Sequence, residues 1–443
     1  VFQPGAMQRS RSPRSRRARR RHEARRPRRS RSRSEPRSSA RERRPPPQRR
    51  VTARNALTGQ VVAEVEVPND PTVSELRSLV RAAAGTPEEL SLWLTHNGVE
   101  LLDSEQFHGD LVDVVLSRRQ LLLTASSDGS TVTWDAATGE FCSWFVGHKL
   151  AVLSAAFSPD GGSIVTGSAD RTARLWTVAT GGWRLTLRGH RSAVLCAAFS
   201  PDGQHIATSS GDRTVRVWSA GNFGECEMAI RGHTGDVSWV CFSPDSKRIA
   251  TASADRLSML WDATSGACEG VLRGHERDVN CVDFSPDGLS IATASGDCTA
   301  RLWSAAAPAR EGSKSCRTLR WHSAGVHAAV FSGDGLRLAT ASADQSAVLW
   351  DVQVGERLAV FRGHRGEVFA VAFSPDDQRL ATGSADGVAK VWDTATGECR
   401  RTLEGHSGSV TAVSFAAPAS AALGGRSGDG SKDRSPQPAA RGV

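Results

Sequence analysis

Tyrosine is absent from this sequence of 443 residues, and lysine is scarce, with 5 residues against 51 arginines. The nine cysteines include no Cys-x-x-Cys pair, so we expect neither a disulfide framework nor a zinc ribbon. No apolar run approaches the roughly 20 residues that a membrane helix requires, and the N-terminus lacks the apolar stretch of a secretory signal. We therefore expect no membrane partner and an intracellular location, in the nucleus, the cytoplasm or a cilium.

Motifs for enzyme chemistry are also missing from the sequence. It contains no phosphate loop, no metal-ligand cluster and no nucleophile motif. We therefore predict a protein that is not an enzyme, with no cofactor, no metal and no small-molecule substrate.

The net charge of +9 is divided unevenly along the chain. Residues 1–50 hold twenty arginines against three glutamates, which gives +17, so the remaining residues carry −8. This segment consists mostly of Arg, Ser and Pro and has almost no apolar side chains to bury, so we predict that it is disordered, as are residues 417–443. Its Arg-Ser dipeptides resemble the low-complexity arms of splicing-type RNA-binding proteins, which implies RNA binding that phosphorylation would weaken. A solvated basic tail or a nuclear-import signal is the alternative.

From Val51 the composition becomes that of a folded domain. Strands are predicted at 51–56, 61–67, 90–94 and 111–116, and Thr72-Val73-Ser74-Glu75 is a capping box that opens a helix ending near Gly85. The apolar face of this helix is predicted to contain Val73, Leu76, Leu79, Val80 and Ala83. The element order ββαββ predicts a β-grasp.

Residues 51–118 resemble ubiquitin-like domains through Leu57-Thr58-Gly59, Leu92-Trp93-Leu94 and Asn97-Gly98-x-x-Leu101. The resemblance implies that the exposed receptor-binding patch of ubiquitin corresponds to Leu57, Trp93 and Val115, although core packing is an equal alternative for these residues. Arg118-Arg119-Gln120 stands where a conjugating tail would carry Gly-Gly, so we expect a module that is not conjugated to other proteins.

A repeat dominates the chain from residue 120 to about 416. Tryptophan recurs at 134, 176, 218, 261, 303, 350 and 392, and histidine at 148, 190, 233, 275, 322, 364 and 406. From each of the first six of these histidines the next tryptophan of the repeat series is 28 residues away. Each period contains motifs such as Gly363-His364, Ser374-Pro375-Asp376 and Val391-Trp392-Asp393, and its alternating residues predict four short strands.

This pattern resembles the WD40 family, which implies an all-β fold, a seven-bladed β-propeller. The first blade would begin at its second strand, 120–126, and the last strand of the repeat, 409–415, would complete it. The repeat with Trp321-His322 and Ser332-Gly333-Asp334 departs from the pattern and has about five extra residues within 305–315. Five cysteines lie six or seven residues before a repeat histidine, where we predict packing residues of outer strands: Cys142, Cys226, Cys268, Cys316 and Cys399.

The resemblance also implies a buried hydrogen-bond network in each blade, formed by a His, a Ser or Thr, an Asp and a Trp. Carried over to this sequence, the seven sets are His148, Ser168, Asp170 and Trp176; His190, Ser210, Asp212 and Trp218; His233, Ser253, Asp255 and Trp261; His275, Ser295, Asp297 and Trp303; His322, Ser342, Asp344 and Trp350; His364, Ser384, Asp386 and Trp392; and His406, Ser126, Asp128 and Trp134. Sevenfold repetition of these residues favours a structural role over hydrolase triads.

In the family, partners contact the top face of the propeller three and five residues after each blade histidine. Among these positions one arc is apolar and another is acidic with aromatic residues, a pattern that suits a peptide with basic and apolar side chains. The predicted partner-binding residues are Leu153, Leu195, Asp236, Asp278, Asn280, His327, Glu367 and Phe369. The Arg-Ser tail is a candidate to fold back on the acidic arc; scattered solvated acids are the alternative.

The resemblance implies a non-catalytic scaffold or adaptor for protein partners, a monomer within a larger complex. Three contexts remain open: a nuclear ribonucleoprotein or pre-mRNA-processing complex, ubiquitin-pathway substrate recruitment, and ciliary dynein assembly. A different class of function is RNA binding through the tail, with the propeller as a bystander.

Overall fold

The computed structural model describes residues 48–55, 60–68, 71–85, 90–96, 99–101, 106–108, 111–221, 224–306 and 317–417. The tails predicted at 1–50 and 417–443 therefore lie almost wholly outside the described residues, as does most of the predicted insertion within 305–315. Among the described residues, no helix is long and apolar enough to cross a membrane.

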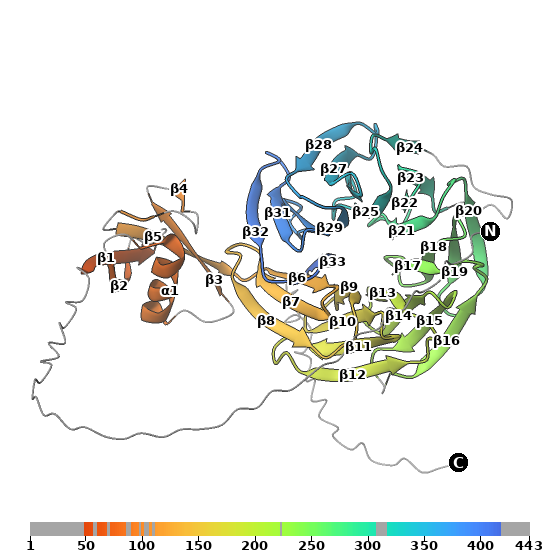
Figure 1. Cartoon of the computed structure of the whole chain (residues 1–443), viewed down its shortest axis with the longest axis horizontal. Coiled ribbons are helices and arrows are strands. Elements are labelled where there is room, and N and C mark those ends of the chain that lie inside the picture. The colour runs from red at the N-terminus through yellow and green to blue at the C-terminus, as the bar shows by residue number, and fades with distance from the viewer. Residues whose placement is uncertain are drawn as a thin grey trace, which may run out of the picture. The chain divides into compact units, whose positions relative to one another are not determined.

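The first folded part is a mixed sheet with one helix (Figure 1). Its sheet order is β2-β1-β5-β3-β4, with β1 parallel to β5 and the other neighbours antiparallel. The elements are β1 (Gln48–Asn55), β2 (Val61–Pro68), α1 (Val73–Ala84), β3 (Leu90–His96), β4 (Val99–Glu100) and β5 (Leu111–Arg118). This order agrees with the expected β-grasp and adds the short strand β4, whereas the relationship to ubiquitin stays a prediction.

Strand β1 begins at Gln48, three residues before the expected start. The backbone of Arg50 pairs with that of Glu66 on β2, and its guanidinium lies 3.6 Å from the Glu66 carboxylate and 3.8 Å from that of Glu64. Opposite charges on neighbouring strands favour pairing, so an arginine that sequence composition assigned to the tail belongs to the sheet.

Helix α1 begins with the expected capping box. The Thr72 N–H donates to the Glu75 carboxylate (3.0 Å), and the Glu75 N–H donates to Thr72 Oγ1 (3.3 Å). Gly85 ends the helix with a φ of 59°, which glycine adopts at little cost.

The buried stripe of α1 differs in part from the predicted one. It contains Val73, Leu76, Arg77 and Val80, which follow i, i+3, i+4 and i+7 spacing. Leu79 and Ala83 lie off this stripe and are exposed, so their prediction as core residues was wrong.

The remaining described chain forms seven antiparallel sheets of four strands each. From the inside outward, the strands of the first six sheets in chain order are β9 (Val152–Phe157), β10 (Ser163–Ser168), β11 (Thr172–Thr177) and β12 (Trp183–Arg188); β13 (Val194–Phe199), β14 (His205–Ser210), β15 (Thr214–Ser219) and β16 (Cys226–Arg231); β17 (Val237–Phe242), β18 (Arg248–Ser253), β19 (Leu257–Asp262) and β20 (Cys268–Arg273); β21 (Val279–Phe284), β22 (Ser290–Ser295), β23 (Thr299–Ser304) and β24 (Arg317–Arg320); β25 (Val326–Phe331), β26 (Arg337–Ser342), β27 (Ser346–Asp351) and β28 (Arg357–Arg362); and β29 (Val368–Phe373), β30 (Arg379–Ser384), β31 (Ala389–Asp393) and β32 (Cys399–Leu403).

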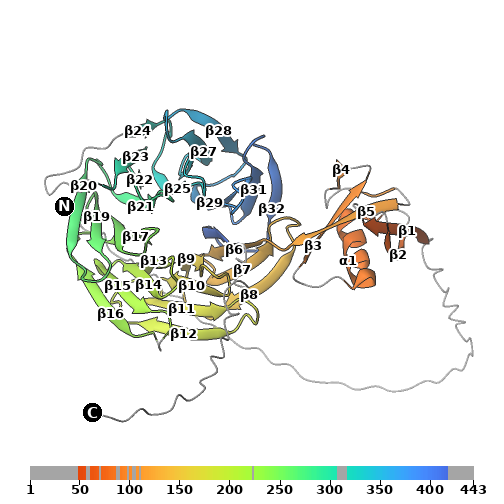
Figure 2. The ribbon, with the colours of Figure 1, turned by 180° about the vertical axis from the view of Figure 1, so that it is seen from behind.

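The seventh sheet joins the two ends of the repeat region. It contains β33 (Val410–Phe415), β6 (Leu121–Ser126), β7 (Ser130–Asp135) and β8 (Phe141–Val146), in this order. Strand β33 pairs with β6 from Val410–Ser126 to Phe415–Leu122 and also lies beside the inner strands β29 and β9. The sheets therefore close into a ring around the inner strands, as Figure 1 and the reverse view in Figure 2 show. The seven-bladed propeller and its seam are confirmed.

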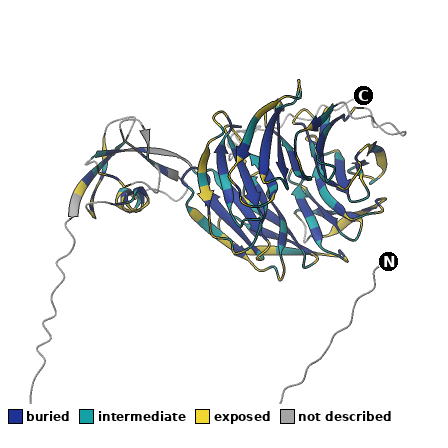
Figure 3. Ribbon diagram, turned by 45° about the horizontal axis from the view of Figure 1, so that its top comes forward, coloured by how far each residue is buried: buried dark blue, intermediate teal, exposed yellow. Residues whose placement is uncertain are grey.

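Burial decreases from the centre of each blade outward (Figure 3). The second strand of every blade is buried along five of its six residues, mostly small ones, as in β30, whereas the outer strands alternate or are exposed, as in β32. Cys226, Cys268 and Cys399 begin outer strands and are exposed, so their prediction as packing residues was wrong. Cys142 is half-buried, and Cys316 lies outside the described residues.

The blade that departs from the repeat has a compensating residue in the next blade. Elsewhere the glycine of one Ser-Pro-Asp-Gly turn packs on the proline of the preceding blade, as Gly288 does on Pro244 (3.7 Å to an added Cβ). Gly333 replaces that proline, and Asp377, with a φ of 57°, replaces the following glycine. The Asp377 carboxylate accepts hydrogen bonds from Gly333 N (2.8 Å) and Asp334 N (2.9 Å). Proline at 333 would lack this N–H, so the two departures belong together.

We predict that Gly333→Pro, which restores the common repeat residue, destabilises the protein. It removes one hydrogen bond to a carboxylate, at a cost of roughly 1.5–3 kcal/mol, because the Asp377 carboxylate loses a donor. In the Gly333→Pro/Asp377→Gly double variant the loss should be smaller than the sum of the two single losses. Urea denaturation of the four proteins measures this coupling, and additive effects would contradict it.

Candidate functional site

A four-residue network fastens each loop between blades to the blade that follows. His364 Nδ1 lies 3.0 Å from Asp386 Oδ2, and His364 Nε2 lies 2.7 Å from Thr382 Oγ1. Trp392 Nε1 donates to the same threonine oxygen at 2.8 Å. Because an ionised carboxylate only accepts, Nδ1 carries the proton and Nε2 accepts from the threonine hydroxyl.

This arrangement recurs in every blade with nearly constant distances. The His Nε2–Thr Oγ1 distance is 2.7–2.9 Å and the Trp Nε1–Thr Oγ1 distance is 2.8–2.9 Å in all seven blades. The His Nδ1–Asp Oδ2 distance is 2.8–3.0 Å in six blades and 3.5 Å at the seam, between His406 and Asp128. The structure thus brings together the histidine, aspartate and tryptophan of each predicted set.

The hydroxyl in the network belongs to a residue other than the predicted serine. It is the threonine two positions earlier, namely Thr166, Thr208, Thr251, Thr293, Thr340, Thr382 and Thr124. Trp392 pairs with Leu380 across the strands, so Thr382 lies about 7 Å along the strand from that position and Ser384 about 13 Å, too far to reach the indole. The assignment of Ser168, Ser210, Ser253, Ser295, Ser342, Ser384 and Ser126 is therefore corrected.

The serines instead stabilise the turn that carries the aspartate. Each accepts a hydrogen bond from the aspartate N–H two residues later at 3.1–3.2 Å, as Ser384 does from Asp386. Ser384 also donates to the Gly366 carbonyl in the loop after His364 (3.2 Å). Since these serines bond to the backbone rather than to the histidine, the recurring Ser, His and Asp do not form hydrolase triads.

The pKa values of six network histidines and of the network aspartates are both lowered, but for different reasons. The pKa of His148, His190, His275, His322, His364 and His406 lies below its usual value because burial penalises the charged ring, and the paired aspartate offsets only part of this effect. Burial raises the pKa of Asp170, but hydrogen bonds from Thr172, His148 and Lys149 N outweigh it, and the pKa falls to about 2. Asp212 and Asp297 behave in the same way.

The predicted partner-binding residues lie on the loops that this network holds. Asp236, Asp278 and Glu367 are exposed, whereas Leu153 and Leu195 are half-buried. His327 Nε2 lies 3.1 Å from Glu367 Oε2, and the His327 ring lies 5.1 Å from the Phe369 ring. These last three residues, from β25, the loop before β29 and β29, therefore form one cluster, which we call the 327/367/369 cluster.

Asn280 has a different role from the expected one. Its Nδ2 donates to the Val326 carbonyl of the next blade (2.8 Å), and Ser238 and Thr411 at equivalent positions make similar bonds to Val279 (2.6 Å) and Val152 (2.7 Å). These side chains link neighbouring blades, so Asn280 is corrected to a structural residue.

Of the three residues of the predicted ubiquitin-like patch, the structure describes the backbones of two. Trp93 and Val115 are paired residues of β3 and β5, and Leu57 lies outside the described residues.

A cationic rim was missed from the sequence. The outer strands of five consecutive blades end in exposed arginines, each two residues before the blade histidine: Arg188, Arg231, Arg273, Arg320 and Arg362. In the departing blade, Trp321 lies between Arg357 and Arg362, whose guanidinium carbons are 5.2 and 5.4 Å from its ring. The repeated arginine before Gly-His was the signal that could have revealed this rim.

Comparison with known families agrees with this architecture. The family model of the WD domain, G-beta repeat, matches residues 139–177, 181–219, 224–262, 266–304, 313–351, 355–393 and 397–431, more than half of the chain. The chain belongs to the WD40 family. No curated protein matches it. WD40 repeats form protein-interaction scaffolds, and this family membership supports protein partners and a non-catalytic role.

The WD40 sequence repeat and the structural blade are offset by one strand. The first match, 139–177, covers the outer strand β8 and then β9, β10 and β11 of the next blade. The last match begins with β32, the outer strand of one blade, and β33, the inner strand of the next. The blade that begins with β33 is completed by β6, β7 and β8 from the other end of the repeat region. Each repeat therefore links two blades, and the network histidine lies in this link.

We predict that Thr382→Val costs more stability than Ser384→Ala. The valine leaves both His364 Nε2 and Trp392 Nε1 buried without a partner, at roughly 1–3 kcal/mol for each group. Ser384→Ala removes the hydrogen bonds to Asp386 N and to the Gly366 carbonyl, at about 1 kcal/mol each. Urea denaturation of both variants provides the comparison, and an equal or reversed order would show that the serine belongs to the network.

We also predict that stability falls as pH decreases below neutral. Because the histidine pKa values are lower in the folded state, the unfolded chain binds protons more readily, and the free energy of unfolding declines as pH falls below about 6.5. A second decline follows below about 4, where the aspartates begin to protonate in the unfolded chain. Urea midpoints of Asp283→Asn between pH 8 and 3 test this, because the raised pKa of Asp283, about 7, would otherwise stabilise the folded parent as pH falls. A constant midpoint of this variant between pH 7.5 and 5 would contradict the neutral histidines.

Proposed function

We propose that this WD40 protein is a non-catalytic scaffold whose top face binds a peptide segment of a protein partner and thereby assembles a multiprotein complex. The observation that carries the proposal is the 327/367/369 cluster, together with the exposed carboxylates Asp236 and Asp278 on the equivalent loops before β17 and β21. An aromatic ring next to a carboxylate suits a segment that presents an apolar and a basic side chain.

The charge pattern of this face narrows the kind of partner. The carboxylates lie on the loops that lead into the inner strands, and the five rim arginines end the outer strands. A segment that is basic and apolar at its centre and acidic in its flanks matches both zones. Opposite charges facing each other accelerate encounter and exclude partners of the wrong charge pattern.

Among the possible complexes, the Arg-Ser composition of residues 1–50 favours a nuclear ribonucleoprotein or pre-mRNA-processing assembly. The resemblance of residues 51–118 to ubiquitin supports ubiquitin-pathway recruitment as an alternative, and ciliary dynein assembly is another. Binding of RNA by the tail alone is a separate function, and folding of the tail onto the acidic arc would regulate the top face. The rim arginines oppose such folding by repulsion.

We predict that Phe369→Ala lowers partner affinity by about 30-fold, since truncation of an aromatic anchor typically costs about 2 kcal/mol. Glu367→Gln should lower it less and reduce its salt dependence. Asp287→Asn is the control, because Asp287 is an exposed carboxylate in the turn after β21, at the opposite end of the strand from the top-face loops. Quantitative pull-down and mass spectrometry, followed by titration of the purified main partner, measure these effects.

The same pull-down separates the competing functions. With residues 1–47 deleted, which leaves β1 intact, or with RNase added, partners of the top face should persist, whereas loss of the main partners in both samples would assign the function to the tail and RNA. Unchanged partner affinity and salt dependence after the deletion would exclude regulation by the tail. Loss of the partners in Trp93→Ala alone would favour the ubiquitin-like module.

A further inference from the structure

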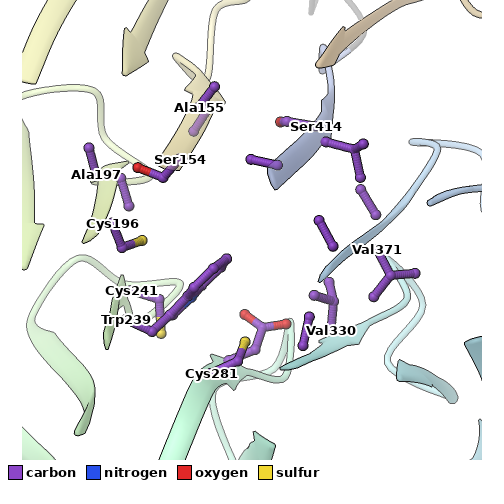
Figure 4. Close-up of a pocket in the computed structure, with 18 of the residues that line it drawn as sticks. Ser154, Ala155, Cys196, Ala197, Trp239, Cys241, Cys281, Val330, Val371 and Ser414 are labelled. Atoms are coloured by element: carbon purple, nitrogen blue, oxygen red, sulfur yellow. The ribbon is translucent and has the colours of Figure 1, made fainter. Parts of the chain in front are cut away.

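The centre of the propeller contains a cavity of about 260 Å³ lined by all seven inner strands. Figure 4 shows labelled side chains from separate blades arranged around it, among them Cys196, Trp239 and Val371. The lining is mostly alanine, valine and cysteine. The cavity is large enough for a ligand with several non-hydrogen atoms.

Two residues break the pattern of small side chains in this lining. Six and eight residues after each blade histidine, the inner strands contribute Ala, Ser, Cys or Val, except for Trp239 and Asp283. Trp239 packs against the apolar clusters of three neighbouring blade regions. No described residue accepts a hydrogen bond from its indole, unlike the indoles of the seven blade tryptophans.

Asp283 is a carboxyl group in an apolar wall without a counter-charge. Its Oδ2 accepts a hydrogen bond from Phe331 N (2.9 Å), and no Lys, Arg or His among the described residues forms an ion pair with it. Burial raises the pKa of Asp283 to about 7. Leaving a carboxyl group here is costly for folding, and such groups concentrate at binding sites.

A second polar group in the lining is also unsatisfied. Ser154, on β9, is 3% exposed, and its Oγ has no hydrogen-bond partner among the described residues. Its Oγ packs against Gly167 of β10, where an added Cβ would lie 2.7 Å from it, so this hydroxyl does not face the cavity and the candidate site depends on Asp283 and Trp239.

We propose that the channel binds an organic cation, a guanidinium or primary ammonium group on a short apolar stem, with its charge on Asp283 and its stem against Trp239, Val330 and Val371. A carboxylate supplies charge-assisted hydrogen bonds to such a group, and an indole face attracts cations. This site goes beyond the peptide-binding role of the top face. The cation can belong to a free small molecule or to a Lys or Arg side chain of a partner.

The pH dependence of this site follows from the groups around Asp283. The titratable groups that interact with it are the thiols of Cys241 on β17 and Cys281 on β21, both kept protonated because burial raises their pKa values. Strand β25 contributes the Phe331 N–H and no charge. Only ionised Asp283 binds the cation, so affinity should rise about tenfold between pH 6 and pH 8 as the carboxyl group loses its proton.

The experiment is calorimetric titration of the full chain with n-butylguanidinium and with n-butylurea, a neutral molecule of the same shape. We expect saturable binding of the cation, at least tenfold tighter than that of the urea. Asp283→Asn, which keeps the side-chain shape, should remove this preference and the pH dependence, and Trp239→Phe should weaken binding severalfold. Glu269→Gln, which removes an exposed carboxylate on the outer strand β20, should bind the cation like the parent protein.

A short peptide with one arginine distinguishes the two sources of the cation. If it binds as tightly as n-butylguanidinium and competes with it, the site accepts side chains of partners; if only the free cation binds, the site is for small molecules. Equal binding of cation and urea, equal binding by the parent and Asp283→Asn, or an affinity of the parent that does not change between pH 6 and 8 would each overturn the proposal. The pH test uses the parent protein alone and is independent of how the variants fold.

Discussion

The hydrogen-bond chain from Trp through Thr and His to Asp is the interaction on which the rest of the propeller depends. Neighbouring blades bury large apolar residues against each other, as Phe361 of one sheet and Leu380 of the next do in one cluster, but apolar contacts have no direction and do not fix the loops between blades. The chain of bonds closes this gap, because the histidine comes from the link with the preceding blade, whereas the threonine, aspartate and tryptophan come from the following sheet. The residues three and five positions after the histidine, which form the top face, are thereby held in fixed places.

The same chain also secures the seam, where the cost of closure is highest. His406 and Thr124 are bonded at 2.7 Å although 282 residues separate them. Pairing of β33 with β6 requires the two ends of the repeat region to meet, which lowers the entropy of the chain. Only the contacts of the completed ring compensate for this loss. The His406–Asp128 distance is longer, at 3.5 Å, and Ser130 Oγ bridges the two groups: it lies 3.1 Å from His406 Nδ1 and donates to Asp128 Oδ1 (2.6 Å).

Periodicity made most of this fold predictable. The constant spacing between His and Trp indicates the number of blades, and the position of the first tryptophan indicates where the ring closes. The same periodicity could not choose between Thr382 and Ser384, because alternate residues of a strand share a face and only the register with Trp392 separates them. Nor could it show that Asn280 bonds to the next blade, or that Leu79 leaves the helix core. These depend on distances between elements that a local pattern does not contain.

Departures from the repeat therefore carry the information about function. They are of two kinds: those with a compensating partner residue nearby and those without one. Gly333 and Asp377 both depart from the repeat, and the Gly333 N–H donates to the Asp377 carboxylate, so this pair maintains the structure of a turn. Asp283 departs without a matching charge among the described residues, in a protein that pairs its repeated polar groups in every blade. An uncompensated departure destabilises the fold unless another molecule supplies the missing group, which makes the channel the place where this propeller differs from a purely structural ring.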